Sequence, residues 1–159
     1  MLRDSDGFFR QIVEEVGAEY PEIKYEQFIV DDFARRIVQQ SKDLDVVVMP
    51  NLYGDILSDA AAGTIGGLGV APSGCYGDGY AYFESIHGTA PDIKGLGIIS
   101  PTATMLSAVL MLDYLGFGDK SKRFENAVRK VYAEGKVLTP DQGGSAKTGE
   151  FTKAVIATL

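Results

Sequence analysis

The spacing of apolar residues in the first part of the chain predicts helices separated by short strands. Apolar side chains recur at helical spacing over residues 8–16, and Gly17 ends that helix. Residues 25–30 have the composition of a strand, and a second helix is predicted to begin at Asp31. The run DVVVM, Asp45–Met49, is typical of a strand that is buried on both faces of a parallel sheet.

The second part of the chain continues this alternation after a glycine-rich segment. A helix of small residues is predicted from Gly54 to about Ile65. Gly63–Gly79 contains seven glycines, which indicates a hinge or crossover between domains. Tyr80–Glu84 is predicted to be a strand, and further helices are predicted over residues 101–115, 124–134 and 149–157. Strands that alternate with helices indicate an α/β fold.

Composition narrows the possible classes of protein. With 159 residues, 45% hydrophobic and 23% charged, the chain is expected to be soluble and globular, forming one domain or parts of two. A net charge of −7 argues against binding to nucleic acid or to an anionic membrane. Cys75 is the single cysteine, so no internal disulfide can form, and a role as a thiol nucleophile is disfavoured because the chain has only one His to activate it. We expect a cytoplasmic protein without a signal peptide or membrane span.

Two aspartates in the segment NLYGDILSD are candidate metal ligands. Asp55 and Asp59 are four residues apart, so they stand one turn apart on the same face of a helix. Like charges repel there, and a hard divalent cation such as Mg²⁺ or Mn²⁺ would offset the repulsion. Asp31 begins another helix and could supply a third ligand. The alternative is an ordinary solvated helix face, although the flanking residues are small and apolar.

The segment HGTAPDI, which follows the strand YAYFE, is a candidate nucleotide-binding loop. Its small residues let the backbone approach a ligand closely. An acid beside such a loop can accept hydrogen bonds from both ribose hydroxyls and would repel a 2′-phosphate, so Asp92 favours NAD over NADP. The loop is not a G-x-G-x-x-G fingerprint, so a Rossmann fold is not predicted. The alternatives are an ordinary turn with a helix-capping Asp92 and a structural role for His87.

Together these motifs resemble the β-decarboxylating dehydrogenases, the family of the isocitrate, isopropylmalate, homoisocitrate and tartrate enzymes. The combination of NLYGDILSD with HGTAPDI is highly specific to that family. The resemblance covers the chain in order, through the stretches SDGFF, IVDDFARRIV, DVVVMPNLYGDILSDAAAG, GGLGVAPSG, FESIHGTAPDIKGLGI, SPTATMLSAVLMLDYLG and TPDQGGSAKTGEF. It implies the second half of an isopropylmalate-dehydrogenase-like fold. Residues 1–66 would belong to the small metal and dimerisation domain, and residues 67–159 to the large nucleotide-binding domain.

The resemblance also implies roles for individual residues. Asp31, Asp55 and Asp59 match the three metal-binding aspartates, and Asp31 and Asp55 are therefore expected to serve catalysis. In the family Asp31 reaches the site of a neighbouring subunit, which implies a homodimer or higher oligomer. The adenosine-binding loop corresponds to His87, Gly88, Thr89, Ala90, Pro91, Asp92 and Ile93.

Two further positions concern the nucleotide. Glu84 matches an acid near the nicotinamide ribose. Ser100 stands where the family commonly has an Asn that contacts adenine, so this contact is expected to be weakened or replaced.

The resemblance therefore implies the C-terminal portion of an NAD-dependent oxidative decarboxylase of a 2-hydroxy acid: isopropylmalate, isocitrate or homoisocitrate. The catalytic lysine of the family would lie just before Met1, and the arginines that hold the substrate would lie further upstream. The chain alone is thus expected to be inactive, and a separate N-terminal half is a possible partner. The alternatives are a non-catalytic, self-associating fragment or partner subunit that retains these sites, and a generic α/β ligand-binding domain.

Overall fold

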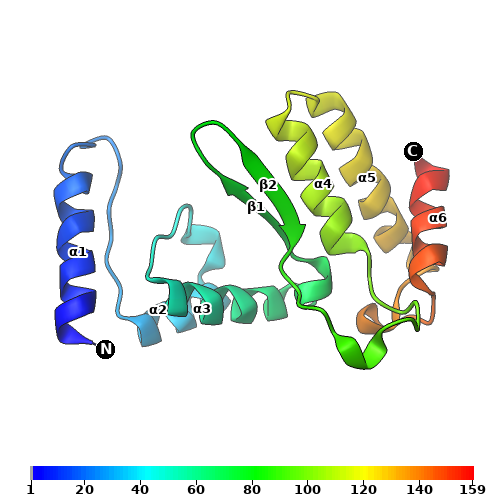
Figure 1. Cartoon of the computed structure of the whole chain (residues 1–159), viewed down its shortest axis with the longest axis horizontal. Coiled ribbons are helices and arrows are strands. Elements are labelled where there is room, and N and C mark those ends of the chain that lie inside the picture. The colour runs from blue at the N-terminus through cyan, green and yellow to red at the C-terminus, as the bar shows by residue number, and fades with distance from the viewer. Residues whose placement is uncertain (1) are drawn as a thin grey trace. The chain divides into compact units, whose positions relative to one another are not determined.

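The computed structural model describes residues 2–159, which form a chain rich in helices with one small sheet (Figure 1). The chain divides into two compact units, unit 1 (Met1–Ala61) and unit 2 (Ala62–Leu159), with the division inside α3. Whether these units correspond to the domains expected at 1–66 and 67–159 stays a prediction. The elements are α1 (Arg3–Gly17), α2 (Val30–Gln39), α3 (Asn51–Thr64), β1 (Pro72–Tyr76), β2 (Ala81–Ser85), α4 (Thr102–Tyr114), α5 (Gly118–Glu134) and α6 (Thr148–Thr158).

Unit 1 contains α1, α2 and most of α3 but few buried side chains. Phe33 of α2 is buried and stacks on Phe28, with ring centroids 6.0 Å apart. The guanidinium of Arg36 lies over the same Phe28 ring, 4.2 Å from its centroid. α1 has the amphipathic pattern expected of it, yet its apolar residues Phe8, Ile12 and Val16 are exposed. Unit 1 therefore presents an apolar surface that its own described residues leave uncovered.

Both strands predicted in unit 1 are wrong for this structure. Residues 25–29 are irregular, and Val30 already begins α2. Asp45–Met49 is also outside any strand. A strand requires a hydrogen-bonded neighbour, and the described part of unit 1 supplies none to either segment. The composition of these segments is that of strands, but composition does not provide the partner.

The sheet in unit 2 is an antiparallel hairpin in which Gly74 pairs with Phe83. One face of the hairpin packs against α4, where the rings of Tyr76, Phe83 and Tyr114 contact one another at centroid distances of 5.6 to 5.8 Å. β1 lies inside the glycine-rich segment that was predicted to be a hinge. The predicted strand at residues 80–84 is confirmed as β2, displaced by one residue.

The core of unit 2 lies between α5 and α6 (Figure 1). Phe151 is fully buried, and its ring lies 5.4 Å from that of Tyr132. Val128 and Val131 are buried, and Phe124 packs against the same cluster. α5 begins at Gly118, six residues before the start of the helix predicted at 124–134. No helix among residues 2–159 is long and apolar enough to cross a membrane.

Candidate functional site

The two acids of NLYGDILSD lie on the exposed side of α3. Leu57, two residues from each of them, is buried, and two residues correspond to about 200° around a helix, so Asp55 and Asp59 face away from the buried side. The side-chain amide of Asn51 donates to Oδ2 of Asp55 at 3.2 Å. Neither aspartate forms an ion pair in the part of the chain that the structure describes. Two exposed, uncompensated carboxylates on one helix face suit a hard divalent cation.

Asp31 lies in the first turn of α2 and is exposed. Its Oδ1 accepts a hydrogen bond from the backbone N–H of Asp32 at 2.9 Å. Across residues 2–159 no three His, Cys, Asp or Glu side chains gather closely enough to hold a metal ion. The chain thus brings Asp55 and Asp59 together but not Asp31 with them. The assignment of the three as ligands stays a prediction.

Its neighbour Asp32 has a different role. Asp32 accepts hydrogen bonds from Arg36 at 2.7 Å and from Arg35 at 2.6 Å. These bonds lower the pKa of the Asp32 carboxyl below its ordinary value, and the bond from Arg36 has the larger effect. Asp32 is therefore committed to the two arginines on its own helix. Of the two consecutive acids, Asp31 is the one whose carboxylate does not pair with a cation.

The loop His87–Ile93 begins two residues after β2 and has an unusual backbone. Ala90 has a φ of +42°, in the left-handed region that residues other than glycine rarely adopt. Such a conformation costs about 1 to 2 kcal/mol and is found preferentially at functional sites. The next three residues, Pro91–Ile93, form a single 3₁₀ turn with Asp92 in it. The loop thus presents exposed backbone at Gly88 and Thr89 beside an exposed carboxylate, which fits a ribose.

His87 at the start of this loop is half-buried. Its Nδ1 lies 3.0 Å from the carbonyl oxygen of Gly88. Because a carbonyl can only accept, Nδ1 carries the proton in this contact and the neutral ring has Nε2 as its acceptor. The contact fixes the ring against its own loop, which is a positioning role and leaves one nitrogen free for a ligand.

Glu84 lies on the hairpin face that α4 does not cover. Side chains alternate along β2, so Glu84 and Tyr82 point to one face and Phe83 to the other. Across the hairpin, Tyr82 pairs with Cys75, and a hydrogen bond to that thiol raises the pKa of the Tyr82 hydroxyl. The exposed carboxylate of Glu84 therefore lies on an accessible surface, close in sequence to the loop that starts at His87.

Ser100 is buried and belongs to a short chain of hydroxyl groups. It is 2% exposed, and its Oγ donates to Oγ1 of Thr102 at 3.0 Å. Oγ1 of Thr102 in turn lies 2.8 Å from the hydroxyl of Tyr132. These bonds join the start of α4 to α5. The Ser100 hydroxyl is thus occupied inside unit 2, and sequence reasoning missed both Thr102 and Tyr132.

Thr148 makes long-range contacts that sequence reasoning did not predict. Its backbone N–H donates to the carbonyl of Gly97 at 2.8 Å, and its hydroxyl donates to the carbonyl of Ile99. The first residue of α6 therefore anchors the segment that follows the candidate loop. The partners are about 50 residues apart in sequence, and no local pattern signals such a contact.

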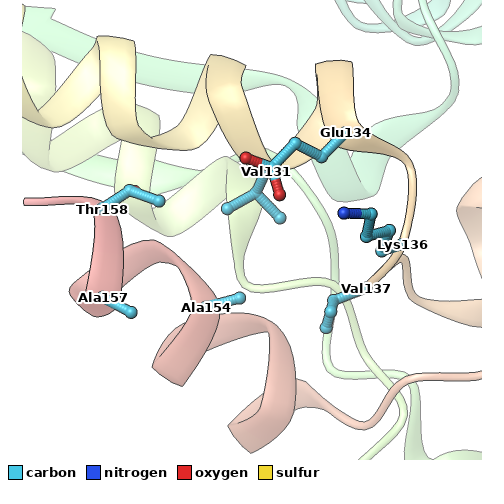
Figure 2. A pocket seen from close by; sticks show the side chains of 7 residues that line it. All are labelled: Val131, Glu134, Lys136, Val137, Ala154, Ala157 and Thr158. Carbon is cyan, nitrogen blue, oxygen red and sulfur yellow. The ribbon is translucent and has the colours of Figure 1, made fainter.

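A cavity of about 210 Å³ lies elsewhere in unit 2 (Figure 2). Figure 2 shows it between α5, α6 and the segment that joins them. It is lined by apolar, charged and hydroxyl side chains: Val131, Glu134, Lys136, Val137, Ala154, Ala157 and Thr158. None of these is a predicted site residue, and the volume is below the range of about 300 to 1,000 Å³ common for ligand sites.

Comparison with known proteins gives consistent matches over nearly the whole chain. The family model for isocitrate/isopropylmalate dehydrogenase matches residues 1–155. The isocitrate/homoisocitrate dehydrogenase of Thermus thermophilus is 50% identical over 155 residues, which are 98% of this chain and 46% of that protein. A probable mitochondrial NAD isocitrate dehydrogenase subunit alpha of Caenorhabditis elegans is 49% identical over 157 residues, 99% of this chain and 44% of that protein.

Solved structures agree. The crystal structure of isocitrate dehydrogenase from Methylococcus capsulatus superposes with a TM-score of 0.92 at 40% identity, covering 99% of this chain and 47% of that one. A beta-decarboxylating dehydrogenase of Thermococcus kodakarensis superposes with a TM-score of 0.82 at 42% identity, covering 97% of this chain and 45% of that one. The chain thus spans less than half the length of these relatives.

Proposed function

Because the chain belongs to the isocitrate/isopropylmalate dehydrogenase family, we propose that it is one portion of an NAD-dependent oxidative decarboxylase. The α/β, non-Rossmann fold expected from the motifs is the one that the solved relatives share. The names of the relatives support isocitrate or homoisocitrate as the substrate. The name of the family adds isopropylmalate as a third candidate substrate. The observation that carries the proposal is the loop at Ala90, whose left-handed backbone holds Asp92 exposed beside small residues.

In this proposal the residues of unit 2 hold the adenosine end of the nucleotide. Asp92 accepts hydrogen bonds from the ribose hydroxyls and disfavours a 2′-phosphate, while the backbone at Gly88 and Thr89 lets the nucleotide approach closely. His87, fixed through Nδ1, offers Nε2 as an acceptor. Glu84 approaches the second ribose. Ser100 supports this surface from inside through Thr102 rather than by contact.

The residues of unit 1 contribute carboxylates. Asp55 and Asp59 would hold Mg²⁺ or Mn²⁺ together, and Asp31 would complete the site of a neighbouring subunit. When bound, the cation supplies an electrophile for the substrate oxygens and NAD⁺ supplies the hydride acceptor. The repulsion between Asp55 and Asp59 is relieved on binding, which favours occupancy of the site.

The proposed reaction needs groups that this chain does not provide. A general base and the cationic residues that hold the substrate are expected in the part of the relatives that the chain does not span, which is more than half of their length. We therefore propose that the 159-residue chain alone does not turn over substrate and works in an oligomer. Cytoplasmic residence remains part of this proposal, although several relatives are named as mitochondrial.

Calorimetric titration of the purified chain with NAD and with NADP tests the nucleotide site. NAD should bind more tightly than NADP, and Asp92→Asn should weaken NAD binding about tenfold, the equivalent of one charged hydrogen bond of about 1.4 kcal/mol. Asp119→Asn, which changes another exposed acid, in the first turn of α5, is the matched control and should leave the affinity unchanged. Equal binding of NAD by the parent chain and by Asp92→Asn would refute the assignment.

A non-catalytic, self-associating chain is the second candidate. The exposed apolar residues of unit 1, such as Phe8 at 65% and Ile29 at 59%, favour association of some kind. Light scattering decides whether the chain associates with itself. A mass that stays at 17.1 kDa over a wide concentration range excludes self-association.

A further inference from the structure

The loop proposed to bind adenosine is braced within itself but has little packing around it. Overlapping turns join its residues, because backbone N–H groups donate three residues back at 3.2 Å, from Ile93 to Ala90, from Lys94 to Pro91 and from Leu96 to Ile93. All of residues 88–97 except Ile93 are exposed. The turns therefore fix Asp92 relative to its neighbours but not relative to the helices of unit 2.

Glycines at the downstream end of the loop allow it to move as a unit. Gly95 has a φ of +82° and Gly97 a φ of +65°, both in the left-handed region that glycine adopts at no steric cost. Glycine has many other accessible backbone conformations as well. Rotation at these positions would carry Asp92 away from its place, unless another contact holds the segment.

Thr148 supplies such a contact from a helix that is fixed in the core. Its backbone N–H donates to the carbonyl of Gly97 at 2.8 Å, and its hydroxyl donates to the carbonyl of Ile99. On the same helix, α6, Phe151 is 0% exposed and Val155 1%. The two hydrogen bonds therefore tether the downstream end of the loop to the core of unit 2.

The tether uses groups that α6 does not need for itself. Thr148 is the first residue of α6, and the first N–H groups of a helix have no partner within it. Lys147, just before it, donates its own N–H to the carboxylate of Glu150 at 2.8 Å. Both bonds from Thr148 thus serve the loop rather than the helix.

We propose that Thr148 is a positioning residue for the nucleotide, which holds the loop so that Asp92 meets the ribose of NAD. It acts through the backbone of Gly97 and Ile99 and does not touch the nucleotide. The inference rests on the proposed function, in which this loop binds adenosine. A loop released from Thr148 occupies the binding position for only part of the time, and the apparent affinity for NAD falls in the same proportion.

Removal of the Thr148 hydroxyl tests the inference in the free chain and with NAD. Thr148→Val keeps the size of the side chain and the backbone N–H. It should speed hydrogen exchange at the Ile93 and Leu96 amides about fivefold without nucleotide. It should also weaken NAD binding, measured by calorimetry, by about the same factor, which corresponds to about 1 kcal/mol, the usual net size of one hydrogen bond.

Two further variants separate the tether from a general effect on α6. Thr148→Ser keeps the hydroxyl and should restore both the slow exchange and the affinity. Thr152→Val is the matched control, because Thr152 is also half-buried and its hydroxyl donates within α6, to the carbonyl of Thr148 at 2.8 Å. It should change neither quantity. In all three variants the amides of Phe151 and Val155 should exchange as in the parent chain.

The possible results distinguish this inference from the proposed function. Unchanged loop exchange in Thr148→Val would overturn the inference, because Thr148 would then not hold the loop. Faster loop exchange with an NAD affinity equal to that of the parent chain would also overturn it. If the parent chain binds no NAD, the proposed function fails and the nucleotide role of Thr148 falls with it, whereas faster loop exchange in Thr148→Val still identifies the tether.

Discussion

Removal of the Ser100 hydroxyl distinguishes a role in the fold from a role in nucleotide binding. In Ser100→Ala two contacts are lost, the bond that Oγ donates to Oγ1 of Thr102 and the longer bond that it accepts from the Thr102 backbone N–H at 3.3 Å, which together cost about 1 kcal/mol net. The buried Thr102 hydroxyl keeps Tyr132 as a partner but loses one of its two contacts, which adds up to about 1 kcal/mol more. We expect a total loss of about 1 to 2 kcal/mol in the free energy of unfolding.

Urea unfolding followed by circular dichroism measures this loss. Thr104→Ala, at an exposed site in the first turn of α4, which Ser100 precedes, is the matched control and should change the stability by less than about 0.5 kcal/mol. The NAD affinity of folded Ser100→Ala, measured by calorimetry, should equal that of the parent chain. Unchanged stability together with a large drop in NAD affinity would refute the reasoning, because it would show that Ser100 contacts the nucleotide directly.

Three further predictions concern separate parts of the chain. Asp92→Lys should shift the ratio of NADP to NAD affinity by about 30-fold towards NADP. Reversal of an exposed charge near the 2′-phosphate changes the free energy of their interaction by about 2 kcal/mol in high dielectric. Paired calorimetric titrations with NADP and NAD measure this ratio. Phe151→Ala should lower the stability of unit 2 by about 3 to 5 kcal/mol in denaturant unfolding, whereas Ile156→Ala on the exposed side of α6 should cost little. The hydrogen bonds from Arg36 and then Arg35 lower the pKa of Asp32 in the folded state. Their contribution to the free energy of unfolding is therefore present above the ordinary aspartate pKa and is lost as pH falls through the lowered value. Asp32→Asn should flatten that part of the acid unfolding curve, which circular dichroism measures.

Helices bounded by proline and glycine could be predicted from the sequence almost to the residue. α4 was expected at 101–115 and spans Thr102–Tyr114, since Pro101 marks its start and Gly116 its end. The start of α5 could not be predicted from the sequence, because Gly118 and Asp119 have the composition of a turn. Local signals therefore define helices well wherever glycine and proline stand outside them.

Strands were predicted less well because their partners are not local. Asp45–Met49 has the composition of a strand but no hydrogen-bonded neighbour strand among the described residues. β1, with the sequence PSGCY, lies in a glycine-rich segment that does not have the composition of a strand, and it is a strand because β2 pairs with it. The local candidate sites, Asp55 with Asp59 and the loop at Asp92, were recognisable because their residues are close in sequence. The internal role of Ser100 and the anchor at Thr148 depend on contacts that only the folded chain reveals.

The account of this chain as one portion of a dehydrogenase is tested most directly by NAD reduction in a pair made of this chain and the portion of a relative that it does not span. The chain and the unmatched portion of the Thermus thermophilus enzyme are assayed separately and together, with isocitrate or homoisocitrate and Mg²⁺. The account predicts NADH formation by the folded pair, none by either portion alone, and loss of activity in the pair that carries Asp55→Asn. A folded pair that forms no NADH, or turnover by the 159-residue chain alone, would contradict it.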